Sequence, residues 1–329
     1  MNPPLRLAQI GLDPASEAAL NHAETLSNLF RDFELLLPKG TFIRRDEPLA
    51  KRTTLRVGGP ADLYVEPSNE SSLALIFETT RLRGLPVAFL GRGSNLLIRD
   101  GGIRGVVISL AHPHFSRITI EGQLITADAG ARLKDIAHEA RKAGLSGLEF
   151  FEGIPGSLGG ALRMNAGAMN AWTFDAVERL RFMDSTGEIH DLSVDKIPVE
   201  YRACPLLRSR IALSATLRGT PDASEAIQSR MKTYTDKRWT TQPKESSAGC
   251  TFKNPLPTLP AGRLIDELGL KGTRIGNAEI STVHGNFLVN LGNATSNDVL
   301  SLISLVQQKA RSVHQIELET EVEILGEDA

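Results

Sequence analysis

The glycine-rich segment GIPGSLGGALRMNAGA at 153–168 limits the possible folds of this chain more than any other feature. It holds five glycines, and a sixth lies just upstream at position 147. Glycine loses more backbone freedom on ordering than any other residue, so this density is costly in a regular helix or strand. The same freedom lets a backbone approach a ligand closely. We therefore expect a loop around Ser157 and Asn165 that wraps along a long ligand.

A second glycine-rich turn, LGRGSNLLI at 90–98, follows a predicted strand. Successive N–H groups in such a turn can form a nest for an anion, and phosphate is the obvious guest. An ordinary tight turn is the alternative interpretation. Neither segment matches the G-x-G-x-x-G pattern with a later acidic residue, nor the G-x-x-x-x-G-K-[ST] pattern. Together the two loops suggest phosphate contact without a Rossmann or P-loop geometry.

Composition excludes several classes of protein. The 329 residues carry a net charge of −2 and only 5% aromatics, which provide neither the basic field nor the stacking surface of a nucleic-acid binder. No stretch approaches the ~20 apolar residues of a membrane span, and the N-terminus does not resemble a signal peptide. The two cysteines, Cys204 and Cys250, cannot build a disulfide framework or a four-cysteine zinc site. We expect a cytoplasmic protein with no metal, no nucleic-acid partner, no membrane insertion and no obligate protein partner.

Hydrophobic periodicity and turn residues predict a mixed α and β chain. An amphipathic helix is expected over 16–37, outside the main fold, with simple packing as its default role. Further helices are expected at 68–84, 133–144, 222–238, 261–269 and 297–315. Strands are expected at 63–67, the start of 86–95, 105–110, 210–219, 287–290 and 318–326, with hairpins at 116–128 and 177–193. We divide the chain into an N-terminal helical extension (1–40), two lobes (41–110 and 111–220) and a third domain (221–329).

Seven segments, in order and in spacing, carry a resemblance to a known family. They are TTLRVGGPADLYVEP (53–67), GRGSNLLI (91–98), GLEFFEGIPGSLGGALRMNAGA (147–168), EYR (200–202), SAGCTFKNP (247–255), GRLIDELGLKG (262–272) and LETEVEILG (318–326). From about residue 40 to its end, the chain resembles UDP-N-acetylenolpyruvoylglucosamine reductase, and the first 38 residues fall outside the resemblance. The resemblance implies an α+β fold with two FAD-binding lobes of the PCMH or vanillyl-alcohol-oxidase type and a C-terminal α+β substrate domain. The compact spacing of its last motifs is similar to the second type of the family, which lacks a loop with a substrate-covering tyrosine.

The resemblance also implies an activity. In the family, NADPH reduces a bound FAD, which passes hydride to the enolpyruvyl double bond of UDP-N-acetyl-enolpyruvoylglucosamine. A protein acid protonates the neighbouring carbon, and the product, UDP-N-acetylmuramate, is a peptidoglycan precursor. We expect non-covalent FAD, because 91–98 contains no histidine that could tether a flavin. Two alternatives stay open: another non-covalent FAD oxidoreductase of this fold, such as an oxidase that uses O₂, and a non-catalytic flavin-binding relative.

Three catalytic residues follow from the resemblance: Arg202, Cys250 and Glu321. Arg202 would stabilise the enolate-like intermediate, although a structural salt bridge is the alternative. Glu321 would bind the substrate carboxylate or relay the proton. On a strand over 318–326 several glutamates would share its face, and only the family register selects it. Cys250 takes the place of the family's proton-donating serine. An ordinary thiol pKa of about 8.5 would leave Cys250 protonated at neutral pH and more acidic than a hydroxyl. The alternative is that Cys250 is a small buried cysteine with only a packing role.

The remaining site residues are also implied by the resemblance. FAD would contact Gly91, Arg92, Gly93, Ser94, Asn95 and Leu96 in the first loop, and Gly153, Ile154, Pro155, Gly156, Ser157, Gly159, Gly160, Asn165, Ala166 and Gly167 in the second. The UDP-sugar would contact Tyr201 and Asn254, with Arg238, Gln242, Ser281, His284 and Asn286 as weaker candidates. A histidine such as His284 is more often packed or hydrogen-bonded than catalytic, and no second ligand stands at metal spacing from it. We expect Cys204 to be a buried structural residue.

Overall fold

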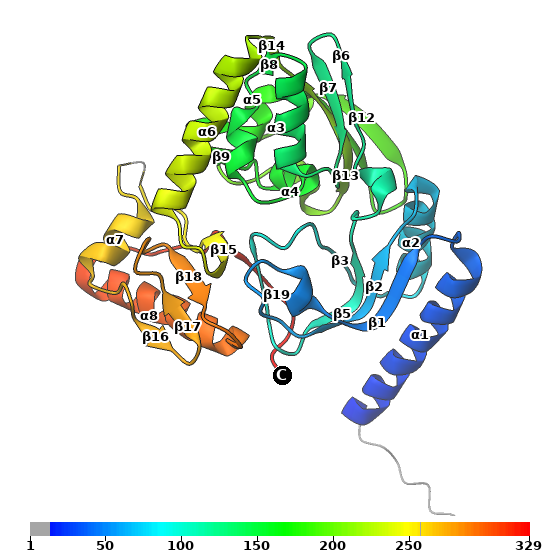
Figure 1. Ribbon diagram of the computed structural model, residues 1–329. Coiled ribbons are helices and arrows are strands. Elements are labelled where there is room, and N and C mark those ends of the chain that lie inside the picture. The colour runs from blue at the N-terminus through cyan, green and yellow to red at the C-terminus, as the bar shows by residue number, and fades with distance from the viewer. Residues whose placement is uncertain (1–13, 257) are drawn as a thin grey trace, which may run out of the picture.

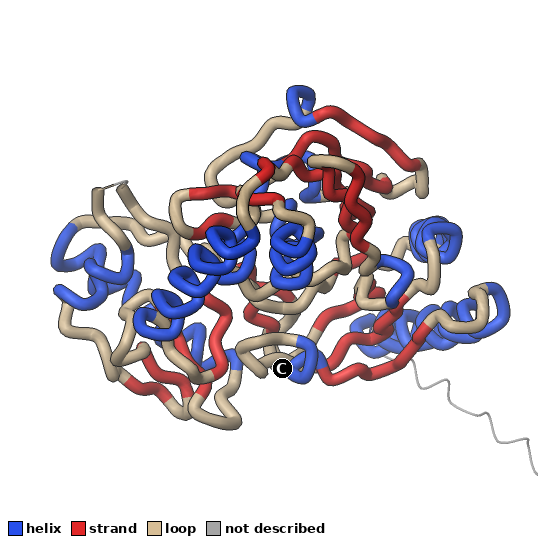
Figure 2. The backbone as a smooth tube through the Cα atoms, turned by 45° about the horizontal axis from the view of Figure 1, so that its top comes forward, coloured by secondary structure: helices blue, strands red, loops and turns tan. Residues whose placement is uncertain are grey.

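The computed structural model describes residues 14–256 and 258–329, so positions 1–13 of the predicted N-terminal extension lie outside the described residues. Figure 1 shows three parts: the first lobe at the lower right with α1, the second lobe at the top, and the third domain at the left. Each part contains both strands and helices, as the turned view in Figure 2 shows. The α+β fold class is confirmed.

The first lobe is a four-stranded sheet of order β1-β2-β5-β3, in which β5 is parallel to both β2 and β3. Its elements are α1 (Pro14–Leu36), β1 (Phe42–Pro48), β2 (Pro60–Glu66), α2 (Glu70–Leu82), β3 (Val87–Phe89), β4 (Leu96–Ile98) and β5 (Ile103–Ile108). The predicted helices at 16–37 and 68–84 are confirmed. Strand β1 was not predicted, because its sequence FIRRDEP has the charged, mostly exposed pattern of an edge strand.

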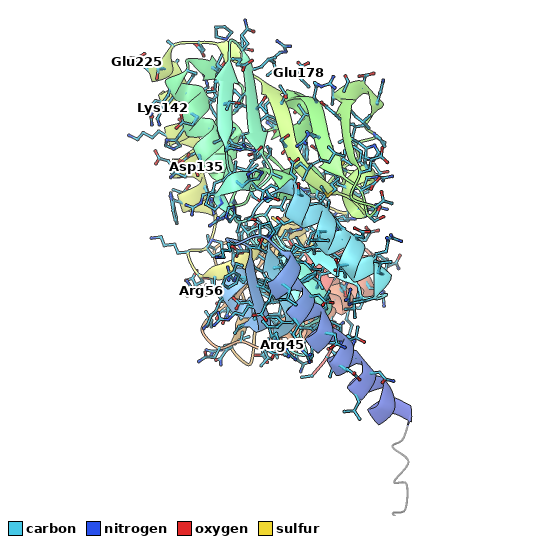
Figure 3. All side chains as sticks on the ribbon, turned by 90° about the vertical axis from the view of Figure 1, so that its right-hand side faces the viewer. Arg45, Arg56, Asp135, Lys142, Glu178 and Glu225 are labelled. Carbon is cyan, nitrogen blue, oxygen red and sulfur yellow. The ribbon has the colours of Figure 1, made fainter. Side chains whose placement is uncertain are left out.

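Helix α1 packs on the protein, which corrects the expectation that it lies outside the main fold. Leu29 and Phe33 are 0% and 1% exposed and join the hydrophobic cluster shared by the first two lobes. Figure 3 faces this helix, which runs diagonally from the first lobe with its N-terminal end projecting beyond the other elements. The apolar stripe of the helix therefore contributes to the core.

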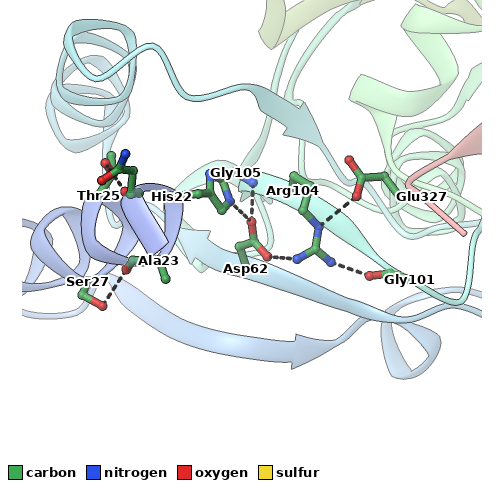
Figure 4. A network of polar contacts seen from close by, with 10 residues as sticks. His22, Ala23, Thr25, Ser27, Asp62, Gly101, Arg104, Gly105 and Glu327 are labelled. Carbon is green, nitrogen blue, oxygen red and sulfur yellow. Dashed lines mark hydrogen bonds and ion pairs between the residues drawn. The ribbon is translucent and has the colours of Figure 1, made fainter. Parts of the chain in front are cut away.

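A buried carboxylate ties α1 and the C-terminus to the first sheet (Figure 4). Asp62 on β2 is 8% exposed, and its Oδ2 lies 2.9 Å from Nε2 of His22 in α1 and accepts a 2.8 Å hydrogen bond from the Gly105 amide. Its other oxygen accepts from Arg104, whose Nε lies 3.6 Å from the Glu327 carboxylate. One acidic side chain thus links four segments that are far apart in the sequence.

The second lobe is a five-stranded antiparallel sheet of order β12-β11-β13-β7-β6. Its strands are β6 (Ile118–Glu121), β7 (Leu124–Asp128), β11 (Val177–Met183), β12 (Ile189–Ser193) and β13 (Ile211–Arg218). Its helices are α3 (Leu133–Lys142), α4 (Leu158–Arg163), α5 (Thr173–Ala176) and α6 (Ser224–Thr241). Four two-residue strands complete it: β8 (Leu145–Ser146), β9 (Gly167–Ala168), β10 (Ala171–Trp172) and β14 (Thr220–Pro221). Both predicted hairpins are confirmed.

The glycine content of segment 153–168 led us to expect a loop, but part of the segment is helical. Residues Leu158–Arg163 form the short helix α4, and Glu149–Gly153 form a 3₁₀ turn before it. The cost of two adjacent glycines in a helix is offset by close packing, because a Cβ on Gly159 would lie 3.1 Å from the Cβ of Ala129. The glycines here serve both a tight helix contact and the surrounding turns.

The third domain is an antiparallel sheet of order β15-β18-β17-β16 with two helices. Its elements are β15 (Ser246–Cys250), α7 (Ala261–Glu267), β16 (Arg274–Ile275), β17 (Ala278–Ile280), β18 (Phe287–Asn290) and α8 (Ser296–His314). The chain then returns to the first lobe, where β19 (Glu323–Leu325) pairs in parallel with β4. A strand was expected over 318–326, but the observed strand begins only at Glu323. Glu321 therefore lies just before the strand and not within it.

Helix α6 packs on the second lobe although the sequence division assigned it to the third domain. Its buried residues Ile227 and Met231 belong to the same hydrophobic cluster as the second sheet, whereas the third domain has a cluster of its own. We therefore propose that the third domain begins after Thr241. Within the described ranges, no helix combines the length and the apolar character that crossing a membrane would require.

Candidate active site

One large cavity, about 1410 Å³ in volume, is lined by residues of all three parts. The two glycine-rich segments meet along it, since a Cβ on Gly91 would lie 3.2 Å from Oγ of Ser157. All the residues predicted to contact FAD line this cavity except Asn165, which lines a smaller neighbouring cavity of about 500 Å³. The larger volume exceeds the range of ~300–1,000 Å³ typical of a small-molecule pocket, so it has room for an extended ligand and a second one beside it.

The glycines of the two segments fit a long ligand laid along the backbone. Gly93 has φ +61°, and a Cβ there would lie 2.5 Å from the carbonyl oxygen of Arg52, so no side chain is tolerated at that position. A Cβ on Gly153 would meet nothing within 4 Å, and one on Gly160 would meet only Oγ of Ser157 at 3.9 Å. These two glycines border open space in the cavity, as a cradle for the flavin dinucleotide requires.

Half-buried arginines give the cavity a positive lining. Burial lowers the pKa of Arg92, and the neighbouring Arg132 lowers it further. Burial also lowers the pKa of Arg238, whose guanidinium donates to the carbonyl of Gly153. Among the described residues, neither Arg92 nor Arg238 forms an ion pair with a carboxylate. Desolvated cations of this kind fit ligands that carry phosphate groups.

The three predicted catalytic residues come together at this cavity. Nε of Arg202 lies 2.9 Å from Oε1 of Glu321, and both side chains are mostly buried. The backbone of Glu321 is fixed on two sides: its amide donates to the carbonyl of Thr251, and its carbonyl accepts from the side chain of Asn95. The first glycine-rich loop, β15 and the C-terminal segment thus hold one another in place around the carboxylate.

The carboxylate and the thiol both have raised pKa values. Burial raises the pKa of Glu321, although the charges of Arg202 and Lys253 oppose the shift. Burial and the charge of Glu321 raise the pKa of Cys250 to about 12, against the opposing effects of Arg202 and Asn286. The expected ordinary thiol pKa of about 8.5 is therefore corrected upward. The thiol holds its proton firmly at neutral pH.

Local backbone irregularities aim these side chains. Arg202 has φ +59°, a left-handed conformation that is costly for a residue with a side chain, and it lies in a tight turn closed by hydrogen bonds between Glu200 and Ala203. The pairing of β15 with β18 shifts register between Ser247 and Cys250, where Gly249 has φ +78°. A bulge of this kind re-aims the side chain that follows it.

Of the predicted substrate-binding residues, only Arg238 and Gln242 line the large cavity. Four of the others have structural partners in the third domain. Asn254 accepts from the Ala261 amide at the start of α7, and Ser281 accepts from the amide of Val283. His284 accepts from the amide of Asn286, and the Asn286 side chain bonds both backbone groups of Phe252. Tyr201 is 50% exposed and packs on Trp172.

Sequence reasoning missed three residues beside the site. Arg163, inside the second glycine-rich segment, lies 2.8 Å from Glu323 and so joins α4 to β19. Arg132 lies next to Arg92, and its place just before a predicted helix was the available signal. Trp172 lies against Arg202. The chain contains only two tryptophans, and this rarity was the one sequence feature that could have drawn attention to Trp172.

Two family models match the chain in agreement with this arrangement. Residues 61–193 match an FAD binding domain, which covers most of the two lobes. Residues 242–325 match the C-terminal domain of UDP-N-acetylenolpyruvoylglucosamine reductase. The second match begins directly after α6.

Relatives of the same name cover nearly the whole chain. UDP-N-acetylenolpyruvoylglucosamine reductase of Clostridium tetani is 41% identical over 288 residues, which are 87% of this chain and 93% of that protein. The enzyme of Bradyrhizobium sp. is 42% identical over 282 residues, or 85% and 91% of the two chains. The crystal structure of the Thermus caldophilus reductase superposes with a TM-score of 0.76 at 38% identity, covering 87% of this chain and 99% of that one. The chain described here therefore belongs to the UDP-N-acetylenolpyruvoylglucosamine reductase family.

Proposed function

We propose that this protein reduces the enolpyruvyl double bond of UDP-N-acetyl-enolpyruvoylglucosamine to give UDP-N-acetylmuramate, with NADPH as the hydride donor and non-covalent FAD as the carrier. The observation that supports this most is the meeting of Arg202, Glu321 and Cys250 at one cavity bordered by two glycine-rich segments. An anion stabiliser and a protonated acid at one place are the groups that an enolate-forming reduction needs. The product is a precursor of peptidoglycan.

The glycine-rich segments would hold FAD, and the positive lining would hold the nucleotide substrates. FAD, when bound, supplies the hydride-carrying chemistry. Arg92 and the backbone amides of 91–96 suit its diphosphate, while Gly153 and Gly160 leave space for the rest of its length. Arg238 and Gln242 at the end of α6 suit a UDP-sugar or NADPH.

The remaining chemistry belongs to side chains of this protein. When hydride adds to one carbon of the substrate double bond, negative charge spreads toward the substrate carboxylate. The guanidinium of Arg202, held beside Glu321, is positioned to stabilise that charge. The thiol of Cys250 then gives its proton to the neighbouring carbon, and the resulting thiolate regains a proton from water. Its raised pKa ensures that the donor is protonated before each turnover.

The proposed reaction would be tested in two half-reactions without oxygen. FAD-loaded protein is mixed with NADPH, and loss of the oxidised flavin absorbance is expected. The enolpyruvyl UDP-sugar is then added, and the absorbance should return in step with formation of UDP-N-acetylmuramate. If the UDP-sugar left the flavin reduced while O₂ reoxidised it at once, an oxidase would be the better assignment.

Two finer points of the proposal have their own tests. Acid precipitation should leave a white pellet and a yellow supernatant, because 91–98 contains no histidine to bond the flavin. We also propose a cytoplasmic location, which the free thiols Cys204 and Cys250 support. Recovery of the native protein mainly outside the cytoplasmic fraction of the cells that produce it would contradict this.

A further inference from the structure

We propose that Trp172 is a positioning residue for the reduction: together with Tyr201 it forms an aromatic bracket that holds the guanidinium of Arg202 against Glu321. The inference rests on the proposed function, because it concerns the arginine that would stabilise charge on the substrate. It adds Trp172 to the residues on which catalysis depends, and it gives Tyr201 a role other than direct contact with the UDP-sugar.

The two rings enclose the guanidinium from neighbouring directions. The central carbon of the Arg202 guanidinium lies 5.1 Å from the ring centroid of Trp172 and 5.6 Å from that of Tyr201. The rings meet edge to face, with centroids 5.7 Å apart and planes at 76°. Both distances lie within the ~6 Å range over which a cation is attracted to an aromatic face. Indole gives the stronger of the two attractions.

Arg202 needs such support because its other contacts are few. Its ion pair with Glu321 is close, yet the Nε–H does not point at an acceptor, so the contact is not a well-aimed hydrogen bond. Its backbone is in the left-handed region, in a turn closed by the Glu200 and Ala203 backbone pair, to which the Asn165 side chain adds a 3.4 Å hydrogen bond on the Glu200 carbonyl. A long side chain on a strained turn has many rotamers, and the bracket restricts them.

Trp172 is itself held rigidly. It pairs with Gly167 across the β9–β10 hairpin, and its backbone amide donates to the carboxylate of Asp175. A Cβ on Gly167 would lie 2.4 Å from the indole ring, so the ring lies directly on the glycine backbone. Gly167, which the resemblance assigned to the cofactor, therefore also makes room for the indole. A side chain at position 167 would therefore displace the indole ring.

The bracket also separates the two cavities. Trp172 and Tyr201 line the smaller cavity of about 500 Å³ but not the large one, whereas Arg202 lines the large cavity but not the smaller. The rings therefore stand between the guanidinium and the smaller cavity. Excluding water on that side strengthens the interaction of Arg202 with a developing negative charge.

The test compares Trp172→Leu, Trp172→Phe and Tyr201→Leu with the wild type in both anaerobic half-reactions. Trp172→Leu is expected to slow flavin reoxidation by the UDP-sugar roughly three- to thirtyfold, the range between an exposed and a desolvated cation–π contact. Flavin reduction by NADPH and the substrate Kd, read from the change in flavin absorbance, should stay within about twofold of wild type. Trp172→Phe should recover most of the rate, and the exposed Tyr201→Leu should give a smaller loss.

The pH profile separates positioning from a general loss of structure. Glu321 faces Arg202, Lys253 and Cys250, and Arg202 is the stronger of the two cations that lower its pKa. A loosened guanidinium lowers that pKa less, so the limb of the reoxidation rate that reports Glu321 should move to higher pH in Trp172→Leu. Val199→Ala, on another wall of the smaller cavity, is the control and should move neither the rate nor the limb.

The outcomes distinguish the two proposals. An inactive wild type would overturn the proposed function. An active wild type with Trp172→Leu and Tyr201→Leu both equal to it in reoxidation rate and pH profile would overturn the bracket alone. If Trp172→Leu failed to bind FAD or to fold, Tyr201→Leu would decide: a reoxidation rate and a pH profile both equal to those of the wild type would overturn the inference.

Discussion

The thiol of Cys250 has to keep a proton at the pH of the reaction and then release it to carbon. Burial and the nearby Glu321 carboxylate secure the first requirement by raising its pKa to about 12. The Arg202 guanidinium favours the thiolate once the proton has left, which helps the second. The three residues therefore act as one unit, and a change in any of them alters the acid.

Replacing the thiol tests its role as the acid. Cys250→Ser keeps a protonated donor at the same place, so substantial activity is expected. Cys250→Ala removes the donor and should slow flavin reoxidation by about 10²- to 10⁴-fold, the usual contribution of a general acid. Anaerobic stopped-flow measurements of both half-reactions would show this, with flavin reduction by NADPH unchanged. Equal reoxidation rates for the alanine variant and the wild type would rule out the thiol as the donor.

Alkylation measures the raised pKa directly. Only the thiolate reacts with iodoacetamide, so the rate should rise about tenfold per pH unit while pH stays below the pKa. With a pKa near 12, the rate at Cys250 should still be rising between pH 8 and pH 10. A thiol of ordinary pKa would approach a plateau there. The Cys250→Ser variant reports the background from the buried Cys204.

The sequence predicted which residues form the unit of Cys250, Arg202 and Glu321, but not the properties that they give one another. Family motifs named all three residues, and the structure brings them together. The pKa of the thiol could not be predicted, because it depends on groups contributed by segments far apart in the chain. Trp172 was missed for the same reason, since its contact with Arg202 joins β10 to a distant turn.

At the scale of elements, the first glycine-rich loop depends on one position that excludes side chains. Gly93→Ala would place a methyl group 2.5 Å from the Arg52 carbonyl at φ +61°, so the loop must shift. We expect a protein that binds FAD much less tightly, as measured by flavin content after gel filtration. Gly122→Ala is a matched control, with φ +60° but open space in a hairpin turn. It carries the same backbone strain and should keep its flavin.

Helix α1 contributes stability without touching the site. Leu29 is fully buried in the shared core, so Leu29→Ala should lower the free energy of unfolding by about 2–5 kcal/mol. Leu35 is on the same helix but 82% exposed, and Leu35→Ala should change the free energy of unfolding by no more than about 0.5 kcal/mol. Urea unfolding of both variants measures this. The rate of NADPH oxidation should be unchanged in both, because neither leucine lines the cavity.

The accuracy of sequence reasoning at this scale depended on how local the signal was. Hairpins at 116–128 and 177–193 were predictable, because alternation and turn residues lie within one short stretch. Strand β1 was not, because an exposed charged edge lacks alternation. The segment 318–326 was overextended, because its strand is fixed by β4, more than two hundred residues away in the chain. The helix inside 153–168 was hidden by glycines that serve close packing.

For the molecule as a whole, Asp62 is the point where α1, the first sheet and the C-terminus are joined (Figure 4). The C-terminal segment contains both Glu321 and Glu327, and Glu327 contacts this network through Arg104. The network therefore helps to hold the segment that positions the active-site carboxylate. Asp62→Asn keeps the shape but removes the charge that Arg104 and His22 face. Loss of the Asp62 charge leaves Arg104 with the longer, 3.6 Å contact to Glu327, and it should cost about 2 kcal/mol, less than for a fully buried pair because the arginine is partly exposed.

Urea unfolding of Asp62→Asn would measure this cost, and Glu317→Gln is the matched control. The Arg311–Glu317 pair is more than half exposed on both sides, so its loss should leave the free energy of unfolding nearly unchanged. Because the network steadies the C-terminal segment, Asp62→Asn should also accelerate amide hydrogen exchange in 321–327. Glu317→Gln should leave that exchange unchanged. Unaltered exchange in Asp62→Asn, despite a measured loss of stability, would mean that β4 alone holds the segment that carries Glu321.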